Sequence, residues 1–255
     1  MRPNLSPGIF AATMAITLAA VWSTSAGAQD TDPNCRDILF SPYLWVPSLN
    51  GTSTVGALPP VEIDAGFSDL FANLNFAMAL HTEFHNGPWA FVIDPMYVSV
   101  ERDLDPGVPV PAGAGPKMGV DMWFVELWAG YRFADQWEAL GGARYQSQDL
   151  DVSGLPSPLP IDSLSVSEDW TDWFVGVRFT ADMNEKWFFA ARADAVIAGD
   201  SDSSYNASVM FNRRFGPGKA LNLGYRYFVD DYENLLSYAW DITQEGPILG
   251  FPWAF

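Results

Sequence analysis

The chain has 255 residues and a formal net charge of −18 at pH 7; 49% of its residues are hydrophobic and 15% are aromatic. So acidic a chain argues against a nucleic-acid partner and against docking on anionic lipid through a basic patch. Its apolar and aromatic content argues equally against a disordered chain, and its length suits one large β domain or two small ones.

The first residues predict a secretory signal peptide at residues 1–28. Arg2 is its only charge, the run GIFAATMAITLAAV follows, and SAGA at 25–28 offers a small-residue cleavage site. The apolar run is shorter than the roughly 17–25 residues of a membrane-spanning helix, which disfavours an anchor helix. We expect a short periplasmic segment at 29–37 after it. Cys35 is the single cysteine, so no intrachain disulfide forms.

From residue 38 onward the dominant period is two, which places alternate side chains on opposite faces of a strand. In VDMWFVELWAGYRF, for example, Trp123, Val125 and Leu127 share one face while Glu126 and Arg132 share the other. The pattern recurs and predicts ten strands, near residues 38–47, 75–85, 89–102, 118–133, 137–151, 169–180, 186–198, 204–215, 219–231 and 237–255.

Two features favour a membrane barrel over a soluble periplasmic β-sandwich binding protein, which remains an alternative. The polar face mixes arginines and carboxylates with Gly, Trp and Phe, whereas the apolar face carries Tyr and Trp near the strand ends. Short turns also alternate with longer loops, at 103–116, 152–167 and 199–204. We therefore predict an all-β fold: a transmembrane antiparallel up-and-down β-barrel of about ten strands (8–12), spanning residues 38–255.

The connection between the first two strands breaks this pattern. Residues 50–66 can extend the first strand and fold back through 56–59. Phe67, Leu70, Phe71 and Leu74 then follow at helical spacing, with Ser68 as a candidate N-cap. We predict one short amphipathic helix in this first loop.

The polar face of the predicted strands carries many charges. Since buried charges must be paired, we predict a salt-bridge network in the lumen. Its expected members are Glu83, Asp94, Glu126, Arg132, Glu138, Arg144, Asp172, Arg178, Arg192, Asp194, Arg214, Arg226, Asp230, Asp241 and Glu245. Such a network can fill a narrow barrel, or it can leave a small cation-tolerant pore, because carboxylates outnumber arginines nine to six and acid rings favour cations.

The only two histidines lie on one strand, in the row His81, Glu83 and His85. Imidazoles and a carboxylate can ligate a metal or serve acid–base catalysis. However, alternate strand residues lie about 6.5–7 Å apart, too far for easy convergence on one ion. We predict no metal site, no cofactor and no enzyme activity. These three residues are the candidates if the chain is instead a lipid-modifying enzyme of the outer membrane.

The last strand raises a question of register. Leu249, Phe251, Trp253 and Phe255 alternate, and continued alternation would carry Asp241 and Glu245 onto the same lipid-facing side. Each acid would cost about 2–4 kcal/mol near the bilayer midplane. We therefore predict a bulge at residues 246–247 that turns both acids toward the lumen.

Several stretches together resemble a broad family of Gram-negative outer-membrane barrels, loosely grouped with OmpA- and OmpW-like small barrels. They are SPYLWVPSLNGTSTVG, FSDLFANLNF, GPWAFVIDPMYVSV, LGGARYQ, NLGYRYFVDDY and GPILGFPWAF. The resemblance implies location in the bacterial outer membrane, contact with its lipid and lipopolysaccharide, and a terminal signal for the outer-membrane assembly machinery, ending at Phe255. It carries over no catalytic residue, so the expected role is structural or weakly pore-forming.

Overall fold

The computed structural model describes residues 38–55, 59–103, 116–154, 163–234 and 238–254. The signal peptide expected at 1–28, the segment 29–37 and Phe255 lie outside these residues. The elements are β1 (Ile38–Trp45), β2 (Ser48–Val55), β3 (Val61–Ala65), α1 (Phe67–Ala72), β4 (Leu74–Asn86), β5 (Trp89–Asp103), β6 (Lys117–Ala134), β7 (Trp137–Ser153), β8 (Ser163–Asp182), β9 (Trp187–Gly199), β10 (Ser203–Gly216), β11 (Lys219–Asn234), β12 (Tyr238–Gly250) and β13 (Trp253–Ala254).

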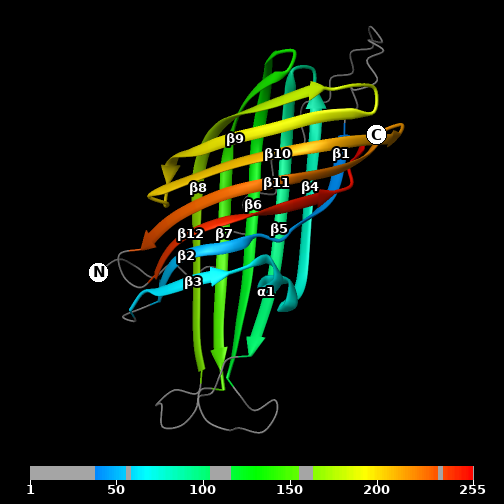
Figure 1. Cartoon of the computed structure of the whole chain (residues 1–255). Coiled ribbons are helices and arrows are strands. Elements are labelled where there is room, and N and C mark those ends of the chain that lie inside the picture. The colour runs from blue at the N-terminus through cyan, green and yellow to red at the C-terminus, as the bar shows by residue number, and fades with distance from the viewer. Residues whose placement is uncertain (1–37, 56–58, 104–115, 155–162, 235–237, 255) are drawn as a thin grey trace. The chain divides into compact units, whose positions relative to one another are not determined.

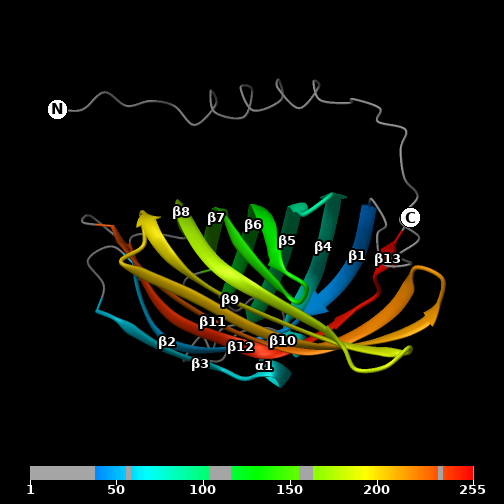
Figure 2. The same ribbon diagram turned by 90° about the horizontal axis from the view of Figure 1, so that it is seen from above.

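The strands close into the predicted antiparallel up-and-down barrel of ten strands (Figure 1). β1 and β2 count as one wall strand, because both continue a single register against β12: Leu44 pairs with Leu249 and Ser48 pairs with Glu245. β13 likewise continues β12 along β1. Seen from above, β4 to β8 with β1 line one side and β9 to β12 with β2 line the other (Figure 2). The closed barrel excludes the β-sandwich alternative.

The first connection contains the predicted fold-back and helix. β3 pairs only with β2 among the described strands, and α1 then leads into β4. The N-cap is Gly66 rather than Ser68: its carbonyl accepts from the backbone N–H of Asp69 at 3.0 Å, and its own N–H donates to the Asp69 carboxylate at 3.3 Å. Leu74 belongs to β4 instead of the helix. Within the described residues, no helix has the length and hydropathy needed to cross a bilayer.

The two ends of the barrel differ. The connections at 87–88, 135–136, 183–186 and 217–218 define what we call the short-turn end. The opposite, loop end carries the remaining connections. There β8 begins at Ser163, so residues 163–167, predicted as loop, extend the sheet by pairing with β7 as far as Ser153. Residues 104–115 and 155–162 lie outside the described part of the chain.

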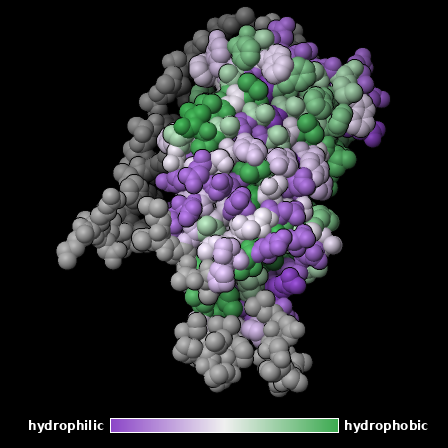
Figure 3. Space-filling model, turned by 60° about the vertical axis from the view of Figure 1, so that its left-hand side comes forward, coloured by the Kyte–Doolittle hydropathy of each residue, from purple (hydrophilic) through white to green (hydrophobic). Residues whose placement is uncertain are grey.

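The outward wall carries an apolar belt that ends before the strands do. Aromatic rings pack together near both edges of the belt: Trp89 with Tyr131 at the short-turn end, and Tyr97 with Trp123 toward the loop end, each pair 4.9 Å apart. On the face seen in Figure 3, hydrophobic residues gather mainly over the upper part, the short-turn end, and hydrophilic residues below. On β7 the outward set changes from Tyr145 to Ser147, Asp149 and Asp151.

This early end of the belt explains why the predicted bulge is wrong. β11 and β12 pair without a register shift from Asn222–Gly250 to Asn234–Tyr238. Asp241 is exposed and Glu245 half-buried on the same side as Leu249, while Ile242 is fully buried inside. The acids therefore do not face the lumen. They lie on the part of β12 that extends past the belt, beside outward polar residues of β2 such as Thr52, so no bulge is needed.

Candidate functional site in the barrel lumen

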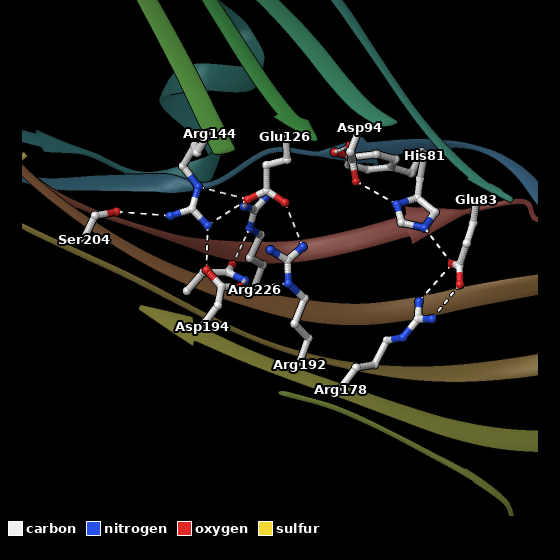
Figure 4. Close-up of polar contacts among 12 residues, drawn as sticks. His81, Glu83, Asp94, Glu126, Arg144, Arg178, Arg192, Asp194, Ser204 and Arg226 are labelled. Atoms are coloured by element: carbon white, nitrogen blue, oxygen red, sulfur yellow. Dashed lines mark hydrogen bonds and ion pairs between the residues drawn. The ribbon is translucent and has the colours of Figure 1, made fainter. Parts of the chain in front are cut away.

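The predicted lumen charges come from neighbouring strands in one register. Asp94 on β5 pairs with Glu126 on β6, Glu126 pairs with Arg144 on β7, and Arg144 pairs with Asp172 on β8. Because alternate residues point inward, strand pairing alone places these four side chains in a row across the inner wall. β8 adds Arg178, and other wall strands add Glu83, Arg192, Asp194 and Arg226 (Figure 4). Asp230, on β11, is also buried inside the barrel.

Glu126 is the centre of this network and is 1% exposed. Arg144 donates to its Oε1 through Nε at 2.9 Å and Nη2 at 2.8 Å, and Arg192 donates to Oε2 at 2.7 Å. Arg226 lies 3.4 Å from Oε1. Arg144 and Arg192 also reach Asp194, at 2.7 and 2.8 Å. Three arginines and two carboxylates thus bridge β6, β7, β9 and β11 across the lumen.

Aromatic rings seal these charges from both sides. The Arg144 guanidinium lies 4.7 Å from the ring centre of Phe174 and 4.8 Å from that of Phe228, and Arg226 lies 4.6 Å from that of Trp45. Arg144 itself is fully buried. The rings belong to two apolar clusters inside the barrel, composed of Trp45, Ala79, Met96, Phe124, Phe228 and Ile248, and of Val92, Trp128, Leu140 and Phe174.

A second group of charges lies toward the short-turn end. Arg178 donates two hydrogen bonds to Glu83, at 2.8 and 2.5 Å, and one to Glu138 at 3.0 Å. A bidentate pair of this kind fixes geometry as well as charge. The group extends through His81 to Asp94, whose other carboxylate oxygen accepts from the Tyr43 hydroxyl at 2.7 Å.

Both histidines contact one carboxylate. His81 Nε2 is 3.2 Å from Glu83 Oε2 and its Nδ1 is 2.8 Å from Asp94; His85 Nε2 is 2.9 Å from Glu83 Oε1. The side chains therefore converge more closely than their spacing along the strand suggested. In the part of the chain that the structure describes, no group of three His, Cys, Asp or Glu residues is placed to hold a metal ion.

A third group lies toward the loop end, where Asp172 and Asp230 are both fully buried. The Ser201 hydroxyl lies 2.7 Å from Asp172 and 3.3 Å from Asp230, and Gln146 donates to Asp230 at 2.7 Å. Asp172 also accepts the backbone N–H groups of Asp200 and Ser201, at 3.0 and 2.9 Å. The β9–β10 connection is thereby held over the lumen.

Beyond this group, aromatic side chains pack inside the loop end. Trp170 and Tyr232 stack at 4.5 Å, within a cluster that also contains Leu49, Tyr238, Trp240 and Ile242. The Tyr238 hydroxyl donates to Gln148 at 2.6 Å, which ties β12 to β7 across the barrel. Charged and apolar layers therefore fill the lumen at successive levels.

Four predicted network members lie elsewhere. Arg132 is exposed at the short-turn rim, and Arg214 pairs with the exposed Asp182 there. Asp241 and Glu245 face outward. This leaves seven carboxylates and four arginines of the predicted set inside the barrel.

Sequence reasoning missed the neutral partners of the network. Ser204 accepts from Arg144, and Asn206 joins Arg226 to Asp194 through hydrogen bonds of 2.7 and 2.8 Å. Their inward positions were readable from the alternation of β10. The charges that Ser204 and Asn206 contact depend on the shear of the barrel wall. The sequence of a single strand does not determine this shear.

No protein-family model and no curated protein matches the chain. Among solved structures, it is similar to the translocator domain of the autotransporter NalP from Neisseria meningitidis, with a TM-score of 0.46, 13% identity and coverage of 88% of this chain and 90% of that chain. It is also similar to the Ralstonia pickettii toluene transporter TbuX (0.37, 8%, 86% and 90%) and to the CymD monoaromatic hydrocarbon channel (0.32, 10%, 86% and 89%). All three TM-scores are below 0.5.

Proposed function

We propose that this chain is a bacterial outer-membrane β-barrel with a closed lumen, structural in role and at most a weak passive pore. It is exported with the signal peptide at 1–28, and its short-turn end and residues 29–37 face the periplasm. The apolar belt between two aromatic edges supports this placement in lipid. The resemblance to OmpA- and OmpW-like barrels is part of the same proposal.

One observation carries the proposed closure: the Arg144 guanidinium, in the middle of the lumen, is fully buried between aromatic rings and two carboxylates. A ten-stranded barrel is only slightly wider than the eight-stranded barrels whose interiors side chains fill. Solvent that passed through the middle of the barrel would have to reach this group. The surplus of inward carboxylates further implies that any residual flux is of small cations rather than anions.

The terminal strand supports a role in assembly. Leu249, Phe251 and Trp253 point outward and are exposed, as a segment read by the outer-membrane assembly machinery must be. We propose that these residues and Phe255 form that signal. Replacing Phe251 and Trp253 together with Ala should lower the amount of assembled barrel, while replacing the inward Ile248 should lower its stability after assembly.

Two measurements test the proposed placement and closure. The protein should fractionate with outer membranes and migrate differently on gels before and after heating, as folded barrels do. Proteoliposomes containing it should not swell in isotonic small sugars beyond protein-free controls. Recovery in the soluble periplasm would remove the proposed location, and sugar-driven swelling would remove the closed lumen.

A further inference from the structure

The outward wall is hollowed over two neighbouring strands. A groove of about 600 Å³ runs over β9 and β10, within the roughly 300–1,000 Å³ of typical ligand pockets. Its floor includes the small residues Ala191, Ala193 and Ala207 of the two central strands. Large outward side chains of the flanking strands form its walls: Trp137, Val177 and Phe179 from β7 and β8, and Tyr225 and Tyr227 from β11.

A positively charged side chain lies on the same outward face as this groove, toward the short-turn end. Arg213 is exposed on the outward side of β10, four residues from Val209 of the groove and beside the short-turn end. Its guanidinium lies 5.7 Å from the Trp187 ring centre, and among the described residues it forms no ion pair. The next residue, Arg214, points the other way and pairs with Asp182. A charge at the edge of an apolar belt is suited to a headgroup phosphate.

We propose that the groove binds one phospholipid of the periplasmic leaflet, with an acyl chain over the alanine floor and the phosphate on Arg213. Four strand residues span about 13 Å, which an acyl chain anchored at Arg213 can cover. The proposal rests on the proposed placement in the outer membrane. A lipid held this way is a bound ligand at a defined place, distinct from the exchanging lipid around the rest of the belt.

Charge favours a lipid over a second copy of the chain. A two-fold dimer presents the same surface from both partners. Two copies paired through this groove would bring two Arg213 guanidinium groups to one interface, where like charges repel and neither gains a carboxylate from this surface. A phosphate satisfies the arginine directly.

Native mass spectrometry of the full-length mature protein, purified in mild detergent and given phosphatidylglycerol, tests the site. Wild type should retain one lipid. Ala193→Trp, which fills the groove, should abolish retention, and Arg213→Gln should weaken it roughly tenfold, the loss expected for one charge-assisted contact. Ala129→Trp, outward on β6, and Arg132→Gln, at the rim, should bind as wild type does.

Heat-modifiable migration verifies that each variant is folded. Equal lipid retention by wild type, Ala193→Trp and Arg213→Gln would overturn the site. A wild-type dimer that Ala193→Trp disrupts would overturn it in favour of a second copy. If wild type binds no lipid but still fractionates with outer membranes, only the proposed lipid site is contradicted. Recovery as a soluble protein would contradict the proposed function as well.

Discussion

Two ion pairs of this barrel have the same length and opposite surroundings. Arg144 and Glu126 approach to 2.8 Å with side chains 0% and 2% exposed, and Lys117 and Glu101 approach to 2.8 Å with side chains 43% and 46% exposed. Water screens the second pair, whereas the first has only protein groups to solvate it. The comparison teaches that distance alone says little about what a charge pair contributes; burial decides how much its loss costs.

The largest effect is expected in the lumen. Arg144→Ala should lower the free energy of unfolding by about 3–5 kcal/mol, because it leaves Glu126 and Asp194 buried with one fewer cation. Urea titration of the barrel in detergent micelles, followed by tryptophan fluorescence, measures this. A loss below about 1 kcal/mol would mean that Arg144 behaves as the exposed Lys117 does.

Neighbouring residues on β12 test the inside–outside assignment next. Ile242→Ala should cost about 2–5 kcal/mol, since it opens a cavity among Trp170, Tyr232 and Trp240. Asp241→Ala should change stability by no more than about 0.5 kcal/mol, as surface substitutions do. Reversed magnitudes in the same urea titration would support the predicted bulge and a position of Asp241 in the lumen.

The histidine group lies between these extremes, half-buried and shared between carboxylates. Replacing His81 and His85 together with Ala should cost about 1–3 kcal/mol, because Glu83 and Asp94 lose hydrogen-bond donors. Phospholipid and lipid A profiles of cells expressing the variant should equal those with wild type. An altered profile, at equal barrel abundance, would support the lipid-modifying enzyme instead.

The smallest effect is expected at the surface pair. Lys117→Ala should shift the midpoint of the urea titration far less than Arg144→Ala does, and the difference from wild type should vanish in 1 M salt, where the Debye length falls to about 3 Å. A salt-independent loss as large as that of Arg144→Ala would erase the distinction between the two pairs.

Alternation and turn spacing were enough to predict the closed barrel and its strand count, and the helical spacing of Phe67, Leu70 and Phe71 predicted the short helix. They failed on β12 for a physical reason: Asp241 and Glu245 were judged against a lipid belt assumed to extend along the whole strand. The belt ends near Pro247 on this side, and its height depends on how neighbouring strands are staggered. The Gly66 N-cap was missed because glycine carries no capping side chain, and the side-chain contact at this cap comes from Asp69, three residues later, whose carboxylate accepts from the Gly66 N–H.

The sequence predicted which residues of the candidate site point inward better than it predicted which of them contact one another. Period two identified Glu126, Arg144 and Arg192 as inward residues, but their strands are separated in sequence by up to 66 positions. Only barrel closure and shear decide which of them meet. The same limit applies to His81 and His85, whose convergence on Glu83 depends on side-chain conformation rather than on strand spacing.

Planar-bilayer conductance of the purified protein tests the central claim, a lumen closed by the Glu126–Arg144 network, most directly. Wild type should show no porin-like steps at neutral pH. Glu126→Ala combined with Arg144→Ala, which removes both charges together, should show steps with cation preference. Steady open conductance by wild type, or anion preference in the double variant, would contradict the account.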